Sequence, residues 1–456
     1  MIVMKFGGTS VGSAAAIERV VSIVQARHCG HPIVIVSAMG DTTDQLIEIG
    51  RNAARGQRER ALRNLCALRE FHRREGRAVS LPADHPEMDR VIDEHFQALT
   101  EIAKGLAVLG ELTPRSLDAI ASFGERLSSR IVALAFRKCG LESVHVDARQ
   151  LILTDRKFTH ATPLYPETYS RVAAALPPLA KDNVVVMGGF IAANKDGETT
   201  TLGRGGSDFT AALVGAGVDA EEIQIWTDVD GVMTCDPALV PDAHRVKTIS
   251  FAEAAELAYF GARVLHPATV IPAMEKNIPV VVLNSLRPNL PGTRIVAQAV
   301  PCKNALKCVA FKRGITAVSI YSTRMLMAHG FLRRIFEVFD RHTTPVDMLA
   351  TSEVSVSLTV DSPERLPEIC DELRPFSEVT VENSQAIICV VGDNIRNTPG
   401  VAARVFGSIE GVNVRMISQG ASLLNLGFVV ADADLPRAVK ALHHEFFAQP
   451  DPAVFD

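Results

Sequence analysis

The stretch LGRGGSDFTAALV (residues 202–214) combines a glycine-rich turn with the start of an apolar helical run. Ser207 is placed to cap that helix, whose apolar positions suit one buried face. The glycines would let backbone N–H groups approach an anion, and the positive end of the helix would add to the attraction. Arg204 would grip a carboxylate or phosphate through two parallel hydrogen bonds. The alternative is a plain turn, because glycine-rich turns commonly precede helices.

Short β-branched runs alternate with amphipathic helical segments on both sides of this stretch. The runs are IVMKF (2–6), PIVIVSA (32–38), SVHVDA (143–148), NVVVMGGF (183–190), IQIWTD (223–228) and IPVVVLN (278–284). They are apolar throughout, which predicts strands buried on both faces, and the helices between them predict a largely parallel sheet in an α/β fold. Residues 45–112 carry charged helical patterns and no strand candidate, so we expect a helical excursion from the sheet.

Length and composition narrow the possible functions. A chain of 456 residues is too long for one core, which predicts two or three domains. The net charge is −5 and the basic residues are scattered, so nucleic acid is not the expected partner. The longest apolar runs fall short of the about 18 residues that would span a bilayer. The eight cysteines form no CxxC pair and the N-terminus has no signal-peptide pattern, so we expect reduced thiols in a cytoplasmic protein.

A domain break is expected at SLRPNLPGT (285–293), which contains two prolines and a glycine. Beyond it, GFLRRIFEVFDRHTTPVDM followed by SVSLTV resembles GVAARVFGSIEGVNVRM followed by NLGFVV. Each copy reads as a helix, a turn and two strands, which predicts two small ferredoxin-like βαββαβ units. We therefore expect a domain at 1–295 and units at 307–384 and 385–456. Such a pair suggests ligand sensing or dimerisation.

The segment MKFGGTSVGSA (4–14) places two glycines between a strand and a helix. Backbone N–H groups of Gly7, Gly8 and Thr9 could hold a phosphate, and Lys5 could reach its oxygens. The chain contains no GxxxxGK[ST] and no GxGxxG, so this is neither a Walker A loop nor a dinucleotide fingerprint. Alternatively, Lys5 is a solvent-exposed lysine at the end of a strand.

Three further segments carry polar side chains that could serve a site. They contain Ser37, Gly40 and Thr43 in VSAMGDTTD, Glu125 in SFGERLSS, and Thr227, Asp228 and Asp230 in IWTDVDGVMTCDP. Ligands of open α/β sheets bind beyond the carboxyl ends of the strands, where these loops would gather. The alternatives are a buried ion pair for Glu125 and turn formation for the two aspartates.

Five segments resemble the signature segments of the aspartokinase family: KFGGTSV, SFGERLSS, TTTLGRGGSDFTAAL, IWTDVDGVMTCDP and FGARVLHPATVIPA. A sixth, TSEVSVSLTVD, resembles that family's effector-binding ACT segment. The resemblance implies an amino acid kinase (carbamate kinase-like) domain of three αβα layers, followed by two ferredoxin-like ACT units. In the family one ACT unit can be inserted within the other, so the last strand is expected to be able to return to the first unit.

The resemblance also implies a reaction: ATP-dependent phosphorylation of the β-carboxylate of L-aspartate to 4-phospho-L-aspartate, the first step of lysine, threonine and methionine biosynthesis. Positioning and electrostatics dominate such phosphoryl transfer, and a carboxylate is already nucleophilic at neutral pH, so no general base is required. Mg²⁺ would accompany ATP, held mainly by the phosphates and water and not by a metal site of the protein.

By the same resemblance, Lys5 would neutralise charge on the transferring phosphoryl group and Asp208 would help to organise the site. Arg204 would hold the α-carboxylate of aspartate and Glu125 its α-amino group. The pocket would be lined by Ser37, Thr43 and Ser207. The nucleotide would be bordered by Lys5, Gly7, Gly8, Thr9, Thr227, Asp228, Met233 and Arg263. Some relatives carry a tyrosine in place of Met233 and a lysine in place of Arg263; arginine keeps the charge but not the geometry of lysine.

The regulatory part resembles lysine-sensitive aspartokinases through Met325, Gly330, Phe331, Leu332, Asp347, Thr351, Ser352 and Glu353. L-Lysine is the inhibitor we expect first, with L-threonine or a second effector as alternatives. Asp347 and Glu353 could meet the charged groups of a free amino acid, although Ala328 and Pro345 depart from the pattern of these relatives. Alternatively, both ACT units only build a homodimer, which could pair into a tetramer.

Two other functions remain open from the sequence. One is another amino acid kinase, acting on glutamate or a nucleotide; Glu125 and Arg204 together favour an α-amino acid instead. The other is a non-catalytic amino acid sensor, whose expected mark is the loss of Lys5, Arg204 or Asp208. All three are present. A homoserine dehydrogenase half is not expected, because the dinucleotide fingerprint is missing and the chain ends at Asp456.

Overall fold

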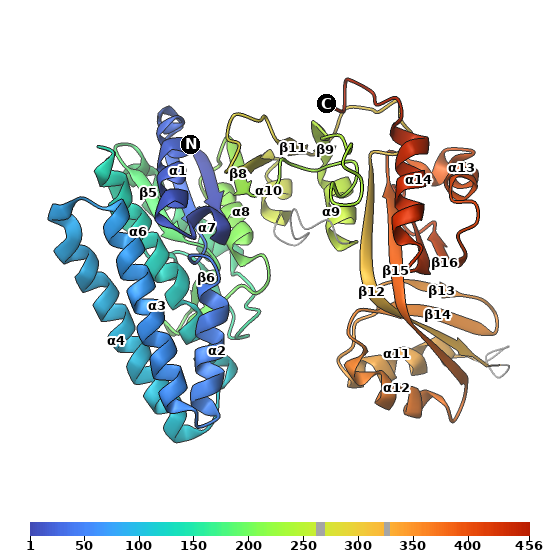
Figure 1. Ribbon diagram of the computed structural model, residues 1–456, viewed down its shortest axis with the longest axis horizontal. Helices are drawn as coiled ribbons and strands as arrows, with labels where there is room; N and C mark the ends of the chain where they lie inside the picture. The colour runs from blue at the N-terminus through green and yellow to red at the C-terminus, as the bar shows by residue number, and fades with distance from the viewer. Residues whose placement is uncertain (261–269, 323–328) are drawn as a thin grey trace. The chain divides into compact units, whose positions relative to one another are not determined.

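The computed structural model describes residues 1–260, 270–322 and 329–456, which form two compact units (Figure 1). The first unit comprises Met1–Val232, Thr248–Phe251 and 270–299, and the second comprises Met233–Lys247, 252–260 and Val300–Asp456. The domain that we expected to end at residue 295 therefore continues to Ala299. It also gives up an internal segment, which begins at Met233, to the second unit.

The first unit is built on an eight-stranded sheet in the order β3-β5-β2-β1-β8-β10-β11-β9. Its strands are β1 (Ile2–Phe6), β2 (Pro32–Val36), β3 (Ser143–Val146), β5 (Val184–Gly188), β8 (Glu222–Thr227), β9 (Thr248–Ser250), β10 (Val280–Asn284) and β11 (Thr293–Val296). The strands from β3 to β10 in this order are all parallel, and β11 pairs antiparallel with β10. The expected largely parallel sheet is confirmed.

Helices cover both faces of this sheet. They are α1 (Ala14–Gln25), α2 (Thr42–Ala54), α3 (Arg58–Val79), α4 (His85–Leu109), α5 (Pro114–Ala121), α6 (Phe123–Lys138), α7 (Tyr165–Ala180), α8 (Gly206–Gly217) and α10 (Ile271–Glu275), with α9 (Phe251–Tyr259) passing into the second unit. Val34 and Val36 of β2 join one core cluster with α1 and α6. Ile33 and Ile35 point to the opposite face, because side chains alternate along a strand, and α7 and α8 pack there. The three layers are confirmed, and α2, α3 and α4 form the expected helical excursion (Figure 1).

Two features of the first unit differ from the sequence-based expectation. All four residues of β3 are only half-buried, because β3 is the edge strand of the sheet. A separate three-stranded sheet of β4 (Leu153–Thr154), β6 (Ile191–Asn194) and β7 (Thr199–Thr201) was not predicted, since these strands are too short to give a periodic signal.

The second unit contains one antiparallel six-stranded sheet in the order β13-β14-β12-β15-β17-β16. Its strands are β12 (Cys308–Tyr321), β13 (Leu349–Thr351), β14 (Ser355–Val360), β15 (Glu378–Val391), β16 (Val414–Gln419) and β17 (Asn425–Ala431). Its helices are α11 (Phe331–Arg341), α12 (Leu366–Leu373), α13 (Val401–Ser408) and α14 (Leu435–Phe447). Two βαββαβ units are therefore present, and they share the long strands β12 and β15.

The sharing of strands runs in the opposite sense to our expectation. The second half of β12 pairs with β14, whereas its first half, 308–312, pairs with 387–391 of β15 and so supplies the fourth strand of the second βαββαβ unit. The chain does not return to the first unit as a last strand; among the described residues after α14, Phe455 makes an isolated bridge with Val246. The physical reason is the length of β12. An irregularity at Gly314, where φ is +69°, divides the strand into two usable halves.

Candidate active site

Polar loops gather at one edge of the sheet of the first unit. Strand β1 pairs in parallel with β2 and with β8, so the residues that follow these three strands are level with one another. The loops begin with Gly7, Ser37 and Asp228. Because this is the carboxyl edge of a parallel sheet, it is the expected place for a ligand.

Lys5 and Asp208 form an ion pair at this edge. Lys5 Nζ lies 2.6 Å from Asp208 Oδ1, and the two side chains are only 12% and 15% exposed. Lys5 comes from β1 and Asp208 from the first turn of α8. A Cβ placed on Gly7 would lie 3.7 Å from Lys5 Nζ, so the glycine leaves room beside the ammonium group. The space next to Lys5 therefore suits an anionic ligand.

Helix α8 begins differently from our expectation. Gly205, at φ +72°, is the residue before the helix, and Ser207 already lies in the first turn rather than capping it. The left-handed backbone conformation at this position favours glycine, which explains why the residue before the helix is Gly205. Ser207 Oγ instead accepts a hydrogen bond from Ser37 Oγ at 3.0 Å. A Cβ on Gly189 would lie 2.7 Å from Ser207 Cα, so this glycine is needed for the close approach of β5 to α8.

Glu125 is buried in the first turn of α6. Its Oε1 accepts a hydrogen bond from the backbone N–H of Ala38 at 3.1 Å, and its Oε2 has no hydrogen-bond partner among the described residues. Burial raises the pKa of the Glu125 carboxyl to about 8, although the hydrogen bond from Ala38 opposes the shift. No cation of the described chain pairs with it, so the expected alternative of a buried ion pair is not observed. A buried carboxyl with one free oxygen suits a cationic ligand.

The side chains of Arg204 and Thr43 differ in how far they are exposed to solvent. Arg204 is exposed in the glycine turn and makes no ion pair with any residue that the structure describes. Thr43 is half-buried in the first turn of α2, and a Cβ on Gly124 would lie 3.3 Å from its Oγ1. This close approach connects the start of α2 to the start of α6, which carries Glu125.

The aspartates after β8 have different environments. Asp230 accepts a hydrogen bond from Asn284 Nδ2 at 2.6 Å and also pairs with Arg287, so its role is to hold the loop, as the turn alternative predicted. Asp228 is exposed and accepts a hydrogen bond from Thr227 Oγ1 at 3.2 Å. Of the two aspartates, Asp228 is the one that remains available to a ligand.

Several residues that position the site were not predicted. Asp118 is buried and accepts hydrogen bonds from the backbone N–H and the hydroxyl of Thr201, at 3.0 and 2.8 Å, so it anchors the chain just before the glycine turn. Ser10 and Ser285 share a hydrogen bond of 2.8 Å, and Ser285 Oγ also donates to the carbonyl of Thr227 at 3.0 Å. These contacts join loops that are distant in sequence, so no local sequence pattern marks the residues that make them.

Of the expected site residues, one that we placed beside the nucleotide belongs to the second unit, and two others lie outside the described ranges. Met233 belongs to the second unit, where it makes an isolated bridge with Arg245. Arg263 and Met325 fall in 261–269 and 323–328, outside the described residues.

In the second unit, Asp347 is the most constrained of the expected effector residues. Its Oδ1 lies 3.2 Å from Lys312 Nζ, and Lys312 also pairs with Asp361. The hydroxyl of Tyr259 donates to the backbone carbonyl of Asp347 at 3.1 Å. The pKa of Asp347 is raised, chiefly by burial, with Lys312 opposing the shift and Asp361 adding to it. The ammonium group of Lys312 therefore already pairs with the carboxylate that we expected to bind an effector.

The other expected effector residues lie around α11 and in the turn after β13. Gly330, at φ +79°, precedes α11; Phe331 is buried at its start and Leu332 is exposed. Thr351 is the last residue of β13. It is followed by Ser352, whose Oγ is hydrogen-bonded to Ser355 Oγ at 2.6 Å, and by the exposed Glu353. The turn therefore presents polar side chains to solvent.

Comparisons with known proteins give this site a family. Residues 1–284 match the amino acid kinase family, and residues 388–446 match an ACT domain. The chain is 35% identical to "Lysine-sensitive aspartokinase 3" of Escherichia coli (strain K12), with 98% of this chain and 99% of that protein covered. It is 39% identical to "Aspartokinase 1, chloroplastic" of Arabidopsis thaliana, with 98% and 80% covered. The chain belongs to the aspartokinase family.

Solved structures of aspartokinases agree with this family assignment. Escherichia coli aspartokinase III in complex with lysine and aspartate (T-state) has a TM-score of 0.85 at 34% identity, covering 98% of this chain and 99% of that one. The same protein in complex with aspartate and ADP (R-state) has a TM-score of 0.83 at 34% identity, covering 98% and 100%. The expected family and fold are thus confirmed, and this aspartokinase is an aspartate kinase. No helix within the described ranges is both long enough and apolar enough to cross a membrane.

Proposed function

We propose that this aspartokinase uses ATP and Mg²⁺ to phosphorylate the β-carboxylate of L-aspartate, giving 4-phospho-L-aspartate for lysine, threonine and methionine biosynthesis. The observation that carries the proposal is the Lys5–Asp208 ion pair of 2.6 Å at the carboxyl edge of the sheet. It places one positive charge between a glycine loop and the N-terminus of a helix, both of which favour anions. The structure of the Escherichia coli relative with aspartate and ADP supports the choice of substrates.

The phosphate end of the site is formed by the loop after β1. Backbone N–H groups of Gly8 and Thr9 would hold phosphate oxygens; the N–H of Gly7, which we also expected to do so, donates instead to the carbonyl of Trp226 at 3.2 Å. Lys5 would offset charge on the transferring group while Asp208 holds its ammonium in place. ATP supplies the phosphoryl group, and Mg²⁺, bound by the phosphates and water, offsets their charge. Further nucleotide contacts are assigned to Thr227, Asp228, Met233 and Arg263.

The amino acid end of the site is formed by Arg204 and Glu125. The guanidinium of Arg204, which is exposed and has no ion-pair partner among the described residues, would hold the α-carboxylate. The free Oε2 of Glu125 would accept a hydrogen bond from the α-ammonium group. Ser37, Thr43 and Ser207 would line the pocket between them. The β-carboxylate needs no general base because it is ionised at neutral pH.

We further propose feedback inhibition by L-lysine, with L-threonine as the alternative effector. Lys312 Nζ lies 3.2 Å from Asp347 Oδ1, and Asp347 Oδ2 is buried without a hydrogen-bond partner among the described residues, which supports a second ammonium group as its ligand. We assign the rest of the effector site to Glu353 and to the side chains of Met325, Phe331, Leu332, Thr351 and Ser352. The resemblance to a lysine-sensitive enzyme, solved with lysine, supports it.

The proposed assembly is a homodimer through the ACT units, which could pair into a tetramer. The proposed location is the cytoplasm. Leu332 and Phe336 are 39% and 37% exposed and lie one turn apart on α11, so they present an apolar strip that a partner could cover. All eight cysteines are unpaired, as expected of a reducing compartment.

The test is aspartate-dependent formation of ADP from ATP and Mg²⁺, with and without millimolar L-lysine or L-threonine. We expect activity with aspartate that L-lysine suppresses and L-threonine does not. Activity indifferent to lysine would remove the effector assignment and leave the kinase. ADP formation that does not depend on aspartate would overturn the proposed reaction.

A further inference from the structure

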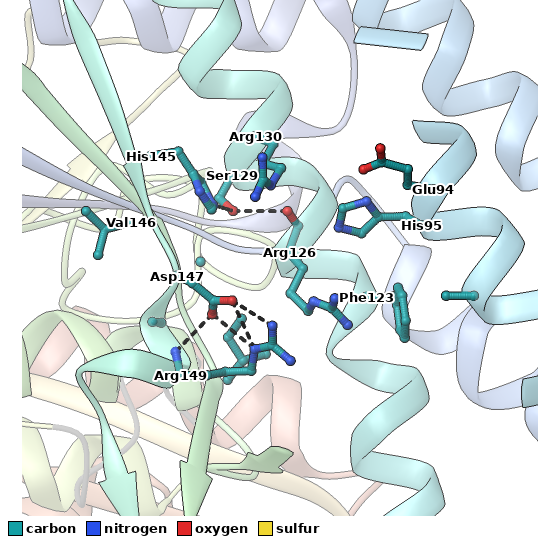
Figure 2. A pocket seen from close by; sticks show the side chains of 14 residues that line it. Glu94, His95, Phe123, Arg126, Ser129, Arg130, His145, Val146, Asp147 and Arg149 are labelled. Carbon is teal, nitrogen blue, oxygen red and sulfur yellow. Dashed lines mark hydrogen bonds and ion pairs between the residues drawn. The ribbon is translucent and has the colours of Figure 1, made fainter. Parts of the chain in front are cut away.

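A cavity of about 230 Å³ lies between α4, α6 and the end of β3 in the first unit (Figure 2). Basic side chains from four elements line it: Arg126 and Arg130 on α6, Arg149 in the 3₁₀ helix Ala148–Gln150, His95 on α4 and His145 on β3. Arg126 and Arg149 are half-buried and Arg130 is exposed. Three arginines around one cavity are unusual where the cavity serves packing alone, because arginine is mostly found on the open surface.

The carboxylates of the cavity do not balance these arginines. Asp147 is committed to Arg149, whose Nε and Nη2 lie 3.0 and 2.6 Å from its two oxygens (Figure 2). Glu94 pairs with Arg90, which is outside the cavity, at 3.4 Å. Arg126 and Arg130 make no ion pair with any residue in the described ranges. Arg130 is exposed to solvent, whereas Arg126 is half-buried, and the nearest negative charge that acts on it is that of Asp147, which Arg149 already holds. The cavity therefore keeps more positive than negative charge.

Burial makes this imbalance costly for Arg126. Its pKa is lowered to about 10, first by burial and then by the charge of Arg149. The guanidinium lies 4.2 Å from the centre of the Phe123 ring, a contact that fixes its position. Burial also lowers the pKa of His95 and of His145 to about 4, so both imidazoles are neutral at pH 7. An anion would restore the charge balance around Arg126.

The cavity is adjacent to the proposed aspartate site but separate from it. On α6, Glu125 and Ser128 bond to the loop after β2: Ser128 Oγ donates to the carbonyl of Ser37 at 2.8 Å. The cavity is lined instead by Arg126 and Arg130 from the same helix. Gly188 lines the cavity, and a Cβ placed on it would lie 3.0 Å from the Cβ of Glu125. The two sites are thus back to back across one helix.

We propose that this cavity binds a small anion bearing a phosphate group or two carboxylate groups, with Arg126 and Arg130 as its principal donors. Guanidinium groups on successive turns of α6 can each give two parallel hydrogen bonds to such an anion. Arg149, oriented by Asp147, adds positive charge from the opposite wall. The proposal concerns binding and does not depend on the phosphotransfer reaction.

The test is calorimetric titration of the full chain in chloride buffer with inorganic phosphate and, separately, with malonate. A Lys5→Met background removes the main cation of the proposed kinase site, so phosphate bound there does not confuse the result. We expect saturable binding of at least one probe, weakened at least tenfold by Arg126→Gln combined with Arg130→Gln. The matched control is Arg137→Gln, since Arg137 lies on the same helix and pairs at the surface with Glu87.

The probe that binds identifies the chemical class of the anion. If the double variant does not fold, Arg130→Gln alone suffices, because Arg130 is exposed; we expect it to weaken binding at least threefold. No saturable binding of either probe, or equal binding by the parent and by the arginine variants, would overturn the proposal.

Discussion

Lys5 Nζ lies 2.6 Å from Asp208 Oδ1, which joins the end of β1 to the first turn of α8. Neither side chain is fully buried, so the pair costs less desolvation than a core ion pair would. The pair fixes the ammonium group beside the glycine loop. We propose that this preorganised charge is the main electrostatic contribution of the protein to phosphoryl transfer.

Replacement of Lys5 by methionine should lower kcat by roughly 100- to 1000-fold, because one preorganised positive charge is lost at the transferring group. Asp208→Asn should have a smaller effect, since the ammonium remains but is less well held. Steady-state kinetics at saturating aspartate measure both. Lys104→Met is the control, because Lys104 pairs with Glu101 on the surface of α4. A Lys5→Met enzyme with near-normal kcat would contradict the assignment.

Arg204→Ala should raise the KM for aspartate at least tenfold while the KM for ATP changes less than twofold. The arginine is exposed and makes no ion pair with the described part of the chain, so the variant should fold normally. Arg156→Ala is the matched control: Arg156 is also exposed, and it pairs with Asp196 and Glu198 and with none of the proposed site residues. Equal changes in the two KM values would assign Arg204 to a general structural role instead.

Glu125→Gln should change how stability depends on pH. In the folded protein, burial raises the pKa of the Glu125 carboxyl from 4.5 to about 8, so the folded state disfavours the ionised carboxyl. The contribution of Glu125 to stability is therefore fully present below pH 4.5 and is lost as the pH rises to 8. Relative to the glutamine variant, the wild-type free energy of unfolding should fall by about 4 kcal/mol across this window.

Denaturant unfolding of both proteins at pH 5 and pH 8 measures this difference. Aspartate should reduce it, because its ammonium group would stabilise the ionised Glu125. A pH dependence that is the same in the wild type and in Glu125→Gln would show that the carboxyl titrates normally.

The layered sheet and the polar loops at its carboxyl edge could be predicted from the sequence because their signals are local. Continuous apolar runs marked β1, β2 and β5, and polar residues directly after the strands marked the loops at the carboxyl edge. The start of α8 was misplaced at Ser207, because a glycine in the left-handed conformation and a serine cap give similar sequence signals. Asp118 was missed because its partner, Thr201, is distant in sequence.

The regulatory part could be predicted less completely for a similar reason. The repeat of helix, turn and two strands predicted two βαββαβ units, but β12 serves both of them through different halves. Which half pairs with which partner depends on tertiary pairing and not on the pattern of the strand itself.

Asp347→Asn should weaken inhibition by L-lysine at least tenfold without changing kcat, since it removes the carboxylate that would bind the effector's ammonium group. Lys312→Met should strengthen inhibition several-fold, because Lys312 occupies the same carboxylate at 3.2 Å. Inhibition curves at fixed aspartate measure both changes. Asp371→Asn is the control, as Asp371 pairs with Arg374 at the surface of α12. Unchanged inhibition in both variants would favour ACT units that serve only dimerisation.

The most direct test of the central claim identifies the carboxyl group that is phosphorylated. Hydroxylamine converts an acyl phosphate into a stable hydroxamate, so a reaction with ATP, Mg²⁺, L-aspartate and hydroxylamine reports the site of transfer. We predict the β-hydroxamate of aspartate, formed in step with ADP and lost in Lys5→Met. Formation of the α-hydroxamate, or ADP without any hydroxamate, would contradict it.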